Sequence, residues 1–144
     1  MNRNAIAATL VFCALAVLAP IAAEAATVVA RVNIAQQLMT VTYNGQPLHV
    51  WPVSTARAGK VTPLGNWKAK WLSRNHKSSI YDNAPMPYSI FYNGNYAVHG
   101  TTSITKLGQP ASAGCVRLHP DNAAILFDLA SREGLDNVMI VVEP

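Results

Sequence analysis

The segment that decides the fold class is TVVARVNIAQQLMTVTYNGQPLHVWPV, residues 27–53. Within it, residues 27–32 and 38–43 alternate between two sets of side chains and are rich in β-branched residues, as strands are. Asn44-Gly45 follows the second run, and this pair supplies the positive φ angles that a tight hairpin turn requires. The segment therefore predicts strands over 27–32, 38–43 and 47–53, with a hairpin at Asn44-Gly45.

Shorter apolar runs extend the β content along the rest of the chain. They predict further strands over 66–72, 89–92, 96–99 and 138–142. Glycine, proline and polar residues predict loops over 54–65 and 73–87. The second loop is long, and long loops are often functional.

One helix is expected between Asp121 and Gly134. The Asp121 carboxylate can accept the free amide hydrogens of a first turn, and Gly134 suits the left-handed position that ends a helix. Ile125, Leu126 and Leu129 recur at helical spacing and predict the apolar face. The chain is therefore expected to form a mostly-β domain, a sandwich or barrel, with one clear α-helix near the C-terminus.

The first 25 residues have the composition of an export signal. Arg3 supplies a positive charge, residues 5–19 form a short apolar run, and Ala23-Glu24-Ala25 is a small-x-small cleavage site. We expect residues 1–25 to be removed on export across the inner membrane. Residues 26–144 would then form a single domain in the periplasm or cell wall. Retention of the segment as an N-terminal anchor is the alternative.

The net charge of the chain limits the kinds of partner that it is expected to bind. The 144 residues include 11 Lys and Arg against 7 Asp and Glu, a net charge of +4. This basic excess is mild and is not gathered in one run. It therefore favours contact with an anionic wall polymer over nucleic-acid binding.

Cysteine usage singles out one residue. Of the two cysteines, Cys13 falls within the expected signal, so an exported chain would retain only Cys115. A secreted chain with a single thiol cannot form an internal disulfide. Its thiol is an intermolecular link, a buried bystander or a reactive group.

The neighbours of this thiol favour reactivity. They read VHGTTSITKLGQPASAGCVRL, residues 98–118, with His99 sixteen residues before Cys115. A free thiol is mostly protonated near neutral pH and attacks carbonyls as the thiolate. An imidazole can take its proton and return it to a leaving amine. The pattern indicates acyl transfer, provided that two short strands bring the side chains together.

The residues around Cys115 supply two further requirements of acyl transfer. Ser112-Ala113-Gly114 is a run of small residues, which lets backbone amides approach a substrate and bind an oxyanion. Arg117 shares a face with Cys115 if the segment is a strand, and its guanidinium can bind a carboxylate. Two alternatives stay open: a salt bridge or packing role for Arg117, and a local turn hydrogen bond for Ser112.

This set of motifs resembles the L,D-transpeptidase catalytic domain, the YkuD family. The family signature is a His-Gly pair, a spacer, and Ser/Thr-His-Gly-Cys followed by an apolar residue and often Arg. Here HGT at 99–101 and SAGCVR at 112–117 take those places. Upstream, WPVST at 51–55, TPLG at 62–65 and APMPY at 84–88 extend the resemblance over essentially all of the expected domain.

The resemblance implies a peptidoglycan L,D-transpeptidase. In that family the cysteine attacks the carbonyl at the L-centre of the third stem-peptide residue, and the terminal D-alanine leaves. A side-chain amine of a second stem then converts the thioester into a 3→3 cross-link. The resemblance further implies peptidoglycan stem peptides as partners, acylation by carbapenems, and no need for a metal or organic cofactor.

The family's roles are carried onto this chain residue by residue. The catalytic set is Cys115 as nucleophile, His99 as general base and acid, the Gly100 carbonyl as orienting group, and the amides of Gly114 and Cys115 as oxyanion donors. The substrate-binding set is Arg117, Ser112, Tyr88 and Tyr81. Both tyrosines flank the polar loop, and core packing is the alternative role for each.

Ala113 is a departure, because the family usually has His at this position. A backbone contact survives that change and a side-chain contact does not. Two rival hypotheses therefore stay open: a non-catalytic peptidoglycan-binding module, and an L,D-carboxypeptidase that trims the wall with water as acceptor. His119 could complete a zinc site with His99 and Cys115, although Pro120-Asp121 favours a loop position before the helix.

Overall fold

The computed structural model describes residues 26–144, so the expected export signal lies outside the described residues. The first sheet has the strand order β3 (Gln46–Pro52), β2 (Leu38–Tyr43), β1 (Val28–Asn33), β9 (Val138–Glu143) and β4 (Gly65–Lys68). The second sheet has the order β5 (Trp71–Lys77), β6 (Pro85–Asn93), β7 (Tyr96–Gly100) and β8 (Val116–Leu118). The remaining elements are α1 (Pro120–Glu133) and two 3-10 helices, η1 (Ile104–Lys106) and η2 (Leu135–Asn137).

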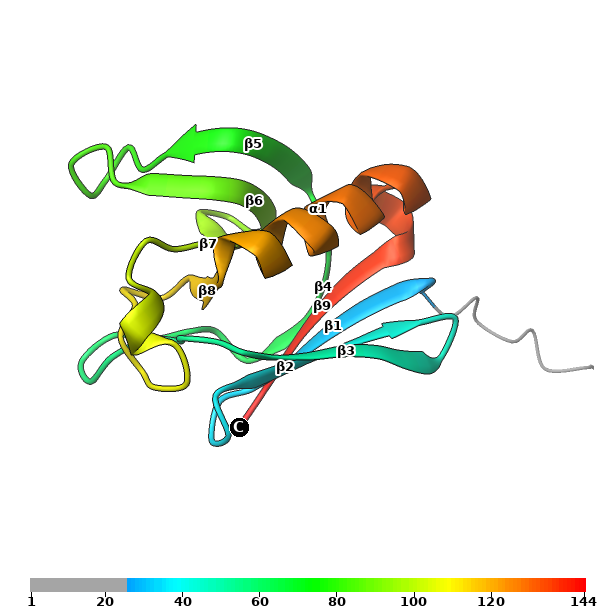
Figure 1. Ribbon diagram of the computed structural model, residues 1–144, viewed down its shortest axis with the longest axis horizontal. Helices are drawn as coiled ribbons and strands as arrows, with labels where there is room; N and C mark the ends of the chain where they lie inside the picture. The colour runs from blue at the N-terminus through cyan, green and yellow to red at the C-terminus, as the bar shows by residue number, and fades with distance from the viewer. Residues whose placement is uncertain (1–25) are drawn as a thin grey trace, which may run out of the picture.

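The helix lies between the two sheets. In Figure 1, α1 runs between β5 and β6 on one side and β9 and β1 on the other. One continuous apolar core joins α1 to both sheets. The predicted architecture, mostly β with one helix near the C-terminus, is confirmed. None of the helices in residues 26–144 is long and apolar enough to span a membrane.

The first sheet follows the predicted pattern closely. Val28, Ala30 and Val32 of β1 are fully buried, as the alternation requires. Asn44 and Gly45 have φ angles of 48° and 77° and join β2 to β3 in an antiparallel hairpin. The hairpin prediction is confirmed, because this pair tolerates the backbone conformation that the turn imposes.

The single strand predicted over 66–72 is wrong, because the chain changes sheets within it. The Ala69 amide still bonds to the Val138 carbonyl at the end of the first sheet, at 2.9 Å. The next amide, that of Lys70, bonds to the Phe91 carbonyl in the second sheet, at 2.7 Å. β5 then continues to Lys77, so the loop predicted over 73–87 shrinks to residues 78–84. The polar residues of β5 suit an exposed strand at a sheet edge.

The helix begins and packs differently from the prediction. His119 is the N-cap, and its Nδ1 accepts a hydrogen bond from the Asp121 amide at 3.1 Å. Pro120 occupies the first helical position, where its missing amide hydrogen costs nothing. The predicted cap at Asp121 is therefore wrong by two residues. Leu126 and Leu129 are buried, whereas Ile125 is 45% exposed and lies outside the apolar face.

The pairing of β7 with β8 positions the site. The strands are parallel, with Val98 opposite Val116 and His99 opposite Arg117. Val98 and Val116 are buried in the core that α1 covers. Because side chains alternate along a strand, His99, Arg117 and the preceding Cys115 face the other side of the sheet. The second sheet thus brings these three residues to one face.

Candidate active site

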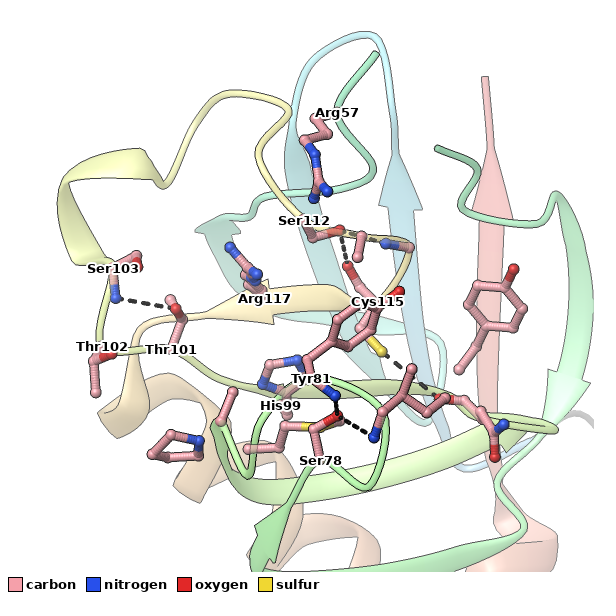
Figure 2. Close-up of a pocket in the computed structure, with 18 of the residues that line it drawn as sticks. Arg57, Ser78, Tyr81, His99, Thr101, Thr102, Ser103, Ser112, Cys115 and Arg117 are labelled. Carbon is pink, nitrogen blue, oxygen red and sulfur yellow. Dashed lines mark hydrogen bonds between the residues drawn. The ribbon is translucent and has the colours of Figure 1, made fainter. Parts of the chain in front are cut away.

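A pocket of about 560 Å³ opens on this face of the second sheet. Cys115, His99 and Arg117 line it from β7 and β8, and Tyr81 and Arg57 line it from two loops. Figure 2 shows these labelled side chains gathered around one space, with Arg57 reaching toward it from the segment after β3. The fold therefore brings together the two reactive groups that the sequence singled out.

One backbone hydrogen bond fixes the His99 ring. Its Nδ1 lies 2.6 Å from the carbonyl oxygen of Gly100. A carbonyl can only accept, so Nδ1 carries the hydrogen and Nε2 is left with its lone pair. Gly100 thus occupies the predicted orienting position. A neutral ring in this tautomer has the form that a general base needs.

Burial keeps the His99 ring neutral. The residue is only 6% exposed. Burial, with a smaller contribution from the Arg117 charge, lowers the pKa of His99 from 6.5 to about 4, and the Gly100 hydrogen bond partly opposes this shift. At neutral pH the imidazole can therefore accept a proton.

The Cys115 thiol also retains its neutral form in the free site. Its sulfur donates a long hydrogen bond to the Asn95 carbonyl, at 3.7 Å. Burial raises the pKa of Cys115, while a hydrogen bond from the Ala97 backbone and the Arg117 charge act in the opposite direction. The proton is therefore still on sulfur near neutral pH and must be removed during attack.

Ser112 is engaged in the turn that carries the nucleophile. It is fully buried, and its Oγ donates to the Cys115 carbonyl at 2.6 Å while accepting from the Gly114 amide at 3.0 Å. The structure thus shows the local turn role that stayed open for Ser112, which also lines the pocket. The Gly114 amide is engaged by Ser112, so it is not free to bind an oxyanion while this turn is intact.

Thr62 braces this turn from outside, and its role was missed in the sequence. Its buried Oγ1 donates to the Gly114 carbonyl at 2.8 Å and accepts from the Ala56 amide at 2.9 Å. The TPLG run at 62–65 was one signal that could have pointed to it. The threonine thereby ties the loop after β3 to the residue before the nucleophile.

Two arginines make the pocket cationic. One guanidinium nitrogen of Arg117 lies 3.5 Å from the Ala111 carbonyl, a long contact. Within the described part of the chain, neither Arg117 nor Arg57 has a salt-bridge partner. Arg117 therefore forms no salt bridge within residues 26–144. Arg57 was missed because nothing in its local sequence links it to the nucleophile.

Of the two tyrosines predicted to bind substrate, one lines the pocket and the other does not. Tyr81 lines the pocket from the loop at 78–84, with its amide held by the Ser78 hydroxyl at 2.9 Å. Tyr88 packs against Phe127 of α1, with ring centroids 5.8 Å apart, and is not among the lining residues. The prediction that Tyr88 binds substrate is wrong, because its ring faces the helix side of the sheet.

The structure also shows where Ala113 and His119 lie, two positions whose roles the sequence left open. Ala113 lines the pocket next to Gly114, where the family usually has His. His119 caps α1, and its ring is committed to the Asp121 amide. Among residues 26–144 no cluster of three His, Cys, Asp or Glu side chains has the arrangement of a metal site.

Comparison with known sequences points to one family. The profile of the L,D-transpeptidase catalytic domain, YkuD, matches residues 27–140. L,D-transpeptidase 1 of Mycobacterium tuberculosis is 27% identical over 110 residues, which are 67% of this chain and 44% of that protein. A probable L,D-transpeptidase of Escherichia coli, ErfK/SrfK, is 32% identical over 72 residues, covering 46% of this chain and 23% of that protein.

Solved structures that superpose on this chain are also L,D-transpeptidases. The L,D-transpeptidase LdtMt1 in complex with imipenem superposes with a TM-score of 0.72 and 25% identity, over 81% of this chain and 59% of that one. An L,D-transpeptidase of Stackebrandtia nassauensis gives a TM-score of 0.71 and 26% identity, over 82% and 56%. The chain thus spans less than two thirds of the length of each of these relatives.

The contacts of Gly114 predict that the nucleophile turn tolerates no side chain there. A Cβ would lie 2.7 Å from the Tyr96 ring and 2.8 Å from the Val61 carbonyl, at a φ of 143°. Gly114→Ala should lower the free energy of unfolding by roughly 2–4 kcal/mol, measured by chemical denaturation. Gly108→Ala is the matched control, because Gly108 has a φ of 90° but open space around it. Equal losses in both variants would contradict the packing argument.

The raised pKa of Cys115 predicts its alkylation profile. The rate of iodoacetamide modification, followed by mass spectrometry of the peptide that carries Cys115, should rise with pH to a midpoint above 9.0. Arg117→Gln should move this midpoint higher, since it removes a nearby positive charge. Arg31→Gln, on the exposed side of β1, should leave it in place. A midpoint below 9.0, or a downward shift in Arg117→Gln, would refute this electrostatic description.

Proposed function

The chain belongs to the L,D-transpeptidase catalytic domain family, and we propose that it is a cysteine acyltransferase acting on peptidoglycan stem peptides. The observation that carries the proposal is that a neutral imidazole, His99, and a protonated thiol, Cys115, line the same cationic pocket. This is the starting state that base-assisted thiol attack requires.

The first half-reaction forms a thioester. Nε2 of His99 takes the thiol proton as Sγ of Cys115 attacks the carbonyl carbon of the third stem residue. The carbonyl becomes an oxyanion, and we assign its stabilisation to the Cys115 amide, because the Gly114 amide is held by Ser112. The C–N bond then breaks, and the departing D-alanine amine takes the proton from His99.

The second half-reaction resolves the thioester. A side-chain amine of a second stem attacks the thioester carbonyl and gives a proton to His99. The C–S bond breaks, and the proton returns to the Cys115 sulfur, so the enzyme is regenerated and a 3→3 cross-link is formed. Water in place of the amine would make the same site an L,D-carboxypeptidase. With either acceptor, the His99 ring is neutral at neutral pH and can accept a proton at Nε2.

The proposal extends to place and inhibitor. An enzyme of this kind must meet peptidoglycan outside the inner membrane, and residues 1–25 have the composition to export it. The relative solved with imipenem supports acylation of Cys115 by carbapenems in this chain as well.

Mass spectrometry of reaction products tests the proposal. With a disaccharide-tetrapeptide as sole substrate, we expect a dimer that has lost one D-alanine. A tripeptide product alone would assign the protein to the carboxypeptidases. An unchanged substrate with folded protein would refute catalysis and favour a peptidoglycan-binding module.

Two variants test the residue roles in the same assay. Cys115→Ala should abolish all products and the imipenem adduct, because no other nucleophile lines the pocket at that position. His99→Gln should reduce the rate by at least roughly 100-fold, as loss of a general base does. His49→Gln on β3 is the matched control and should keep the full rate. A persistent adduct in Cys115→Ala would eliminate this nucleophile.

A further inference from the structure

The charge of the pocket exceeds what the chemistry of thiol attack requires. Of the twenty lining residues, Arg57 and Arg117 are charged at neutral pH, and none is Asp or Glu. Both guanidinium groups are therefore available to an anionic ligand. A guanidinium forms its strongest hydrogen bonds with a carboxylate or a phosphate.

Backbone hydrogen bonds hold the two arginines on adjacent segments. The Arg57 amide donates to the Ser112 carbonyl at 2.9 Å. Three residues away, Ser54 exchanges two hydrogen bonds with Arg117, at 2.9 and 3.0 Å. Residues 54–57 thus run beside residues 112–117, and each of these two segments carries one of the arginines. Two guanidinium groups from two segments can each bind one anionic group of the same ligand.

No carboxylate of the described residues, 26–144, forms a salt bridge with Arg57. Arg57 is exposed, and its charge contributes to lowering the pKa of Arg117, behind the larger effect of burial. Two like charges in one pocket raise the energy of the empty site. A ligand with two carboxylates would relieve that repulsion.

The stem peptide of the proposed function carries such a pair. The leaving D-alanine ends in a carboxylate close to the scissile bond, and a diaminopimelate third residue has a second carboxylate on its side chain. Arg117 lies two residues from Cys115 on the same strand face, about 7 Å along the strand, so it suits the nearer carboxylate. Arg57 lies beside Ser112, and its charge is not among those that act on the Cys115 thiol, whereas the Arg117 charge is, so Arg57 suits the more distant carboxylate.

We propose that Arg57 is a specificity-determining residue that binds the free side-chain carboxylate of the third stem residue, while Arg117 binds the carboxylate of the leaving residue. The assignment rests on the proposed function for the identity of the ligand. It predicts that the protein discriminates against stems in which the side-chain carboxylate is amidated. Recognition of this kind falls on the acyl donor and leaves the choice of acceptor unaffected.

A binding cycle tests this assignment without relying on catalysis. The Cys115→Ala protein is titrated with three tetrapeptide donors: one with both carboxylates free, one amidated on the side chain, and one amidated at the C-terminus. Amidation of the side chain should weaken binding roughly 10- to 100-fold, as loss of a charge-assisted hydrogen bond does. Adding Arg57→Gln should weaken binding of the free donor by the same factor and leave binding of the side-chain amide unchanged.

Two controls sharpen the cycle. Arg57→Lys keeps the charge without the two-pronged geometry and should give an intermediate loss. Arg31→Gln removes one positive charge from the exposed face of β1, where Arg31 pairs with Glu143, and should change none of the affinities by more than about twofold.

Three results would overturn the assignment. Arg57→Gln could weaken binding of the free donor and the side-chain amide equally, could lose its effect only with the C-terminal amide, or could have no effect on any donor. Failure of the proposed function is distinguishable from these, since it would appear as absent product in the protein with intact Cys115 while the binding differences persist.

Discussion

The site depends on the hydrogen bond between Nδ1 of His99 and the Gly100 carbonyl, at 2.6 Å. This contact fixes both the tautomer and the orientation of a ring that is almost fully buried. Burial alone would lower the pKa of an imidazole and leave it free to rotate. With the bond in place, the unprotonated Nε2 is held in the pocket that Cys115 lines. The proposed base is thus held by one main-chain group, and no carboxylate of residues 26–144 forms a hydrogen bond with it.

The rest of the fold places Cys115 in the same pocket as that ring. The parallel pairing of β7 with β8 puts His99 opposite Arg117, and Cys115 lies two residues before Arg117. The turn before β8 is then closed from inside by Ser112 and braced from outside by Thr62. These polar groups satisfy one another's hydrogen-bonding capacity. The turn is therefore stable in a backbone conformation that only glycine tolerates at position 114. Rigid support of this kind keeps a catalytic geometry within the narrow tolerance that acyl transfer needs.

Patterns in the sequence predicted the fold class and singled out two residues, His99 and Cys115, that line one pocket, and long-range contacts account for what the patterns missed. Alternation and the Asn44-Gly45 pair are local signals, so the first hairpin could be predicted. The crossing between sheets at residues 69–70 carries no glycine or proline, and it was read as one strand. Ser112 could be assigned correctly only once its partners were known. Arg57 contributes to the site because its segment pairs with residues far along the chain. No local pattern encodes such a pairing.

The most direct test of this account is a nitrogen-15 NMR titration of the His99 imidazole in the free protein. The account predicts a ring protonated at Nδ1 and unprotonated at Nε2 at neutral pH, gaining its second proton only near pH 4. The sign follows from burial, which disfavours the charged ring until the solution is well below pH 6.5. A ring protonated at Nε2 would contradict the account, since that nitrogen could not take the proton of Cys115. A ring that titrates near 6.5 would contradict the effect of burial on which the account relies.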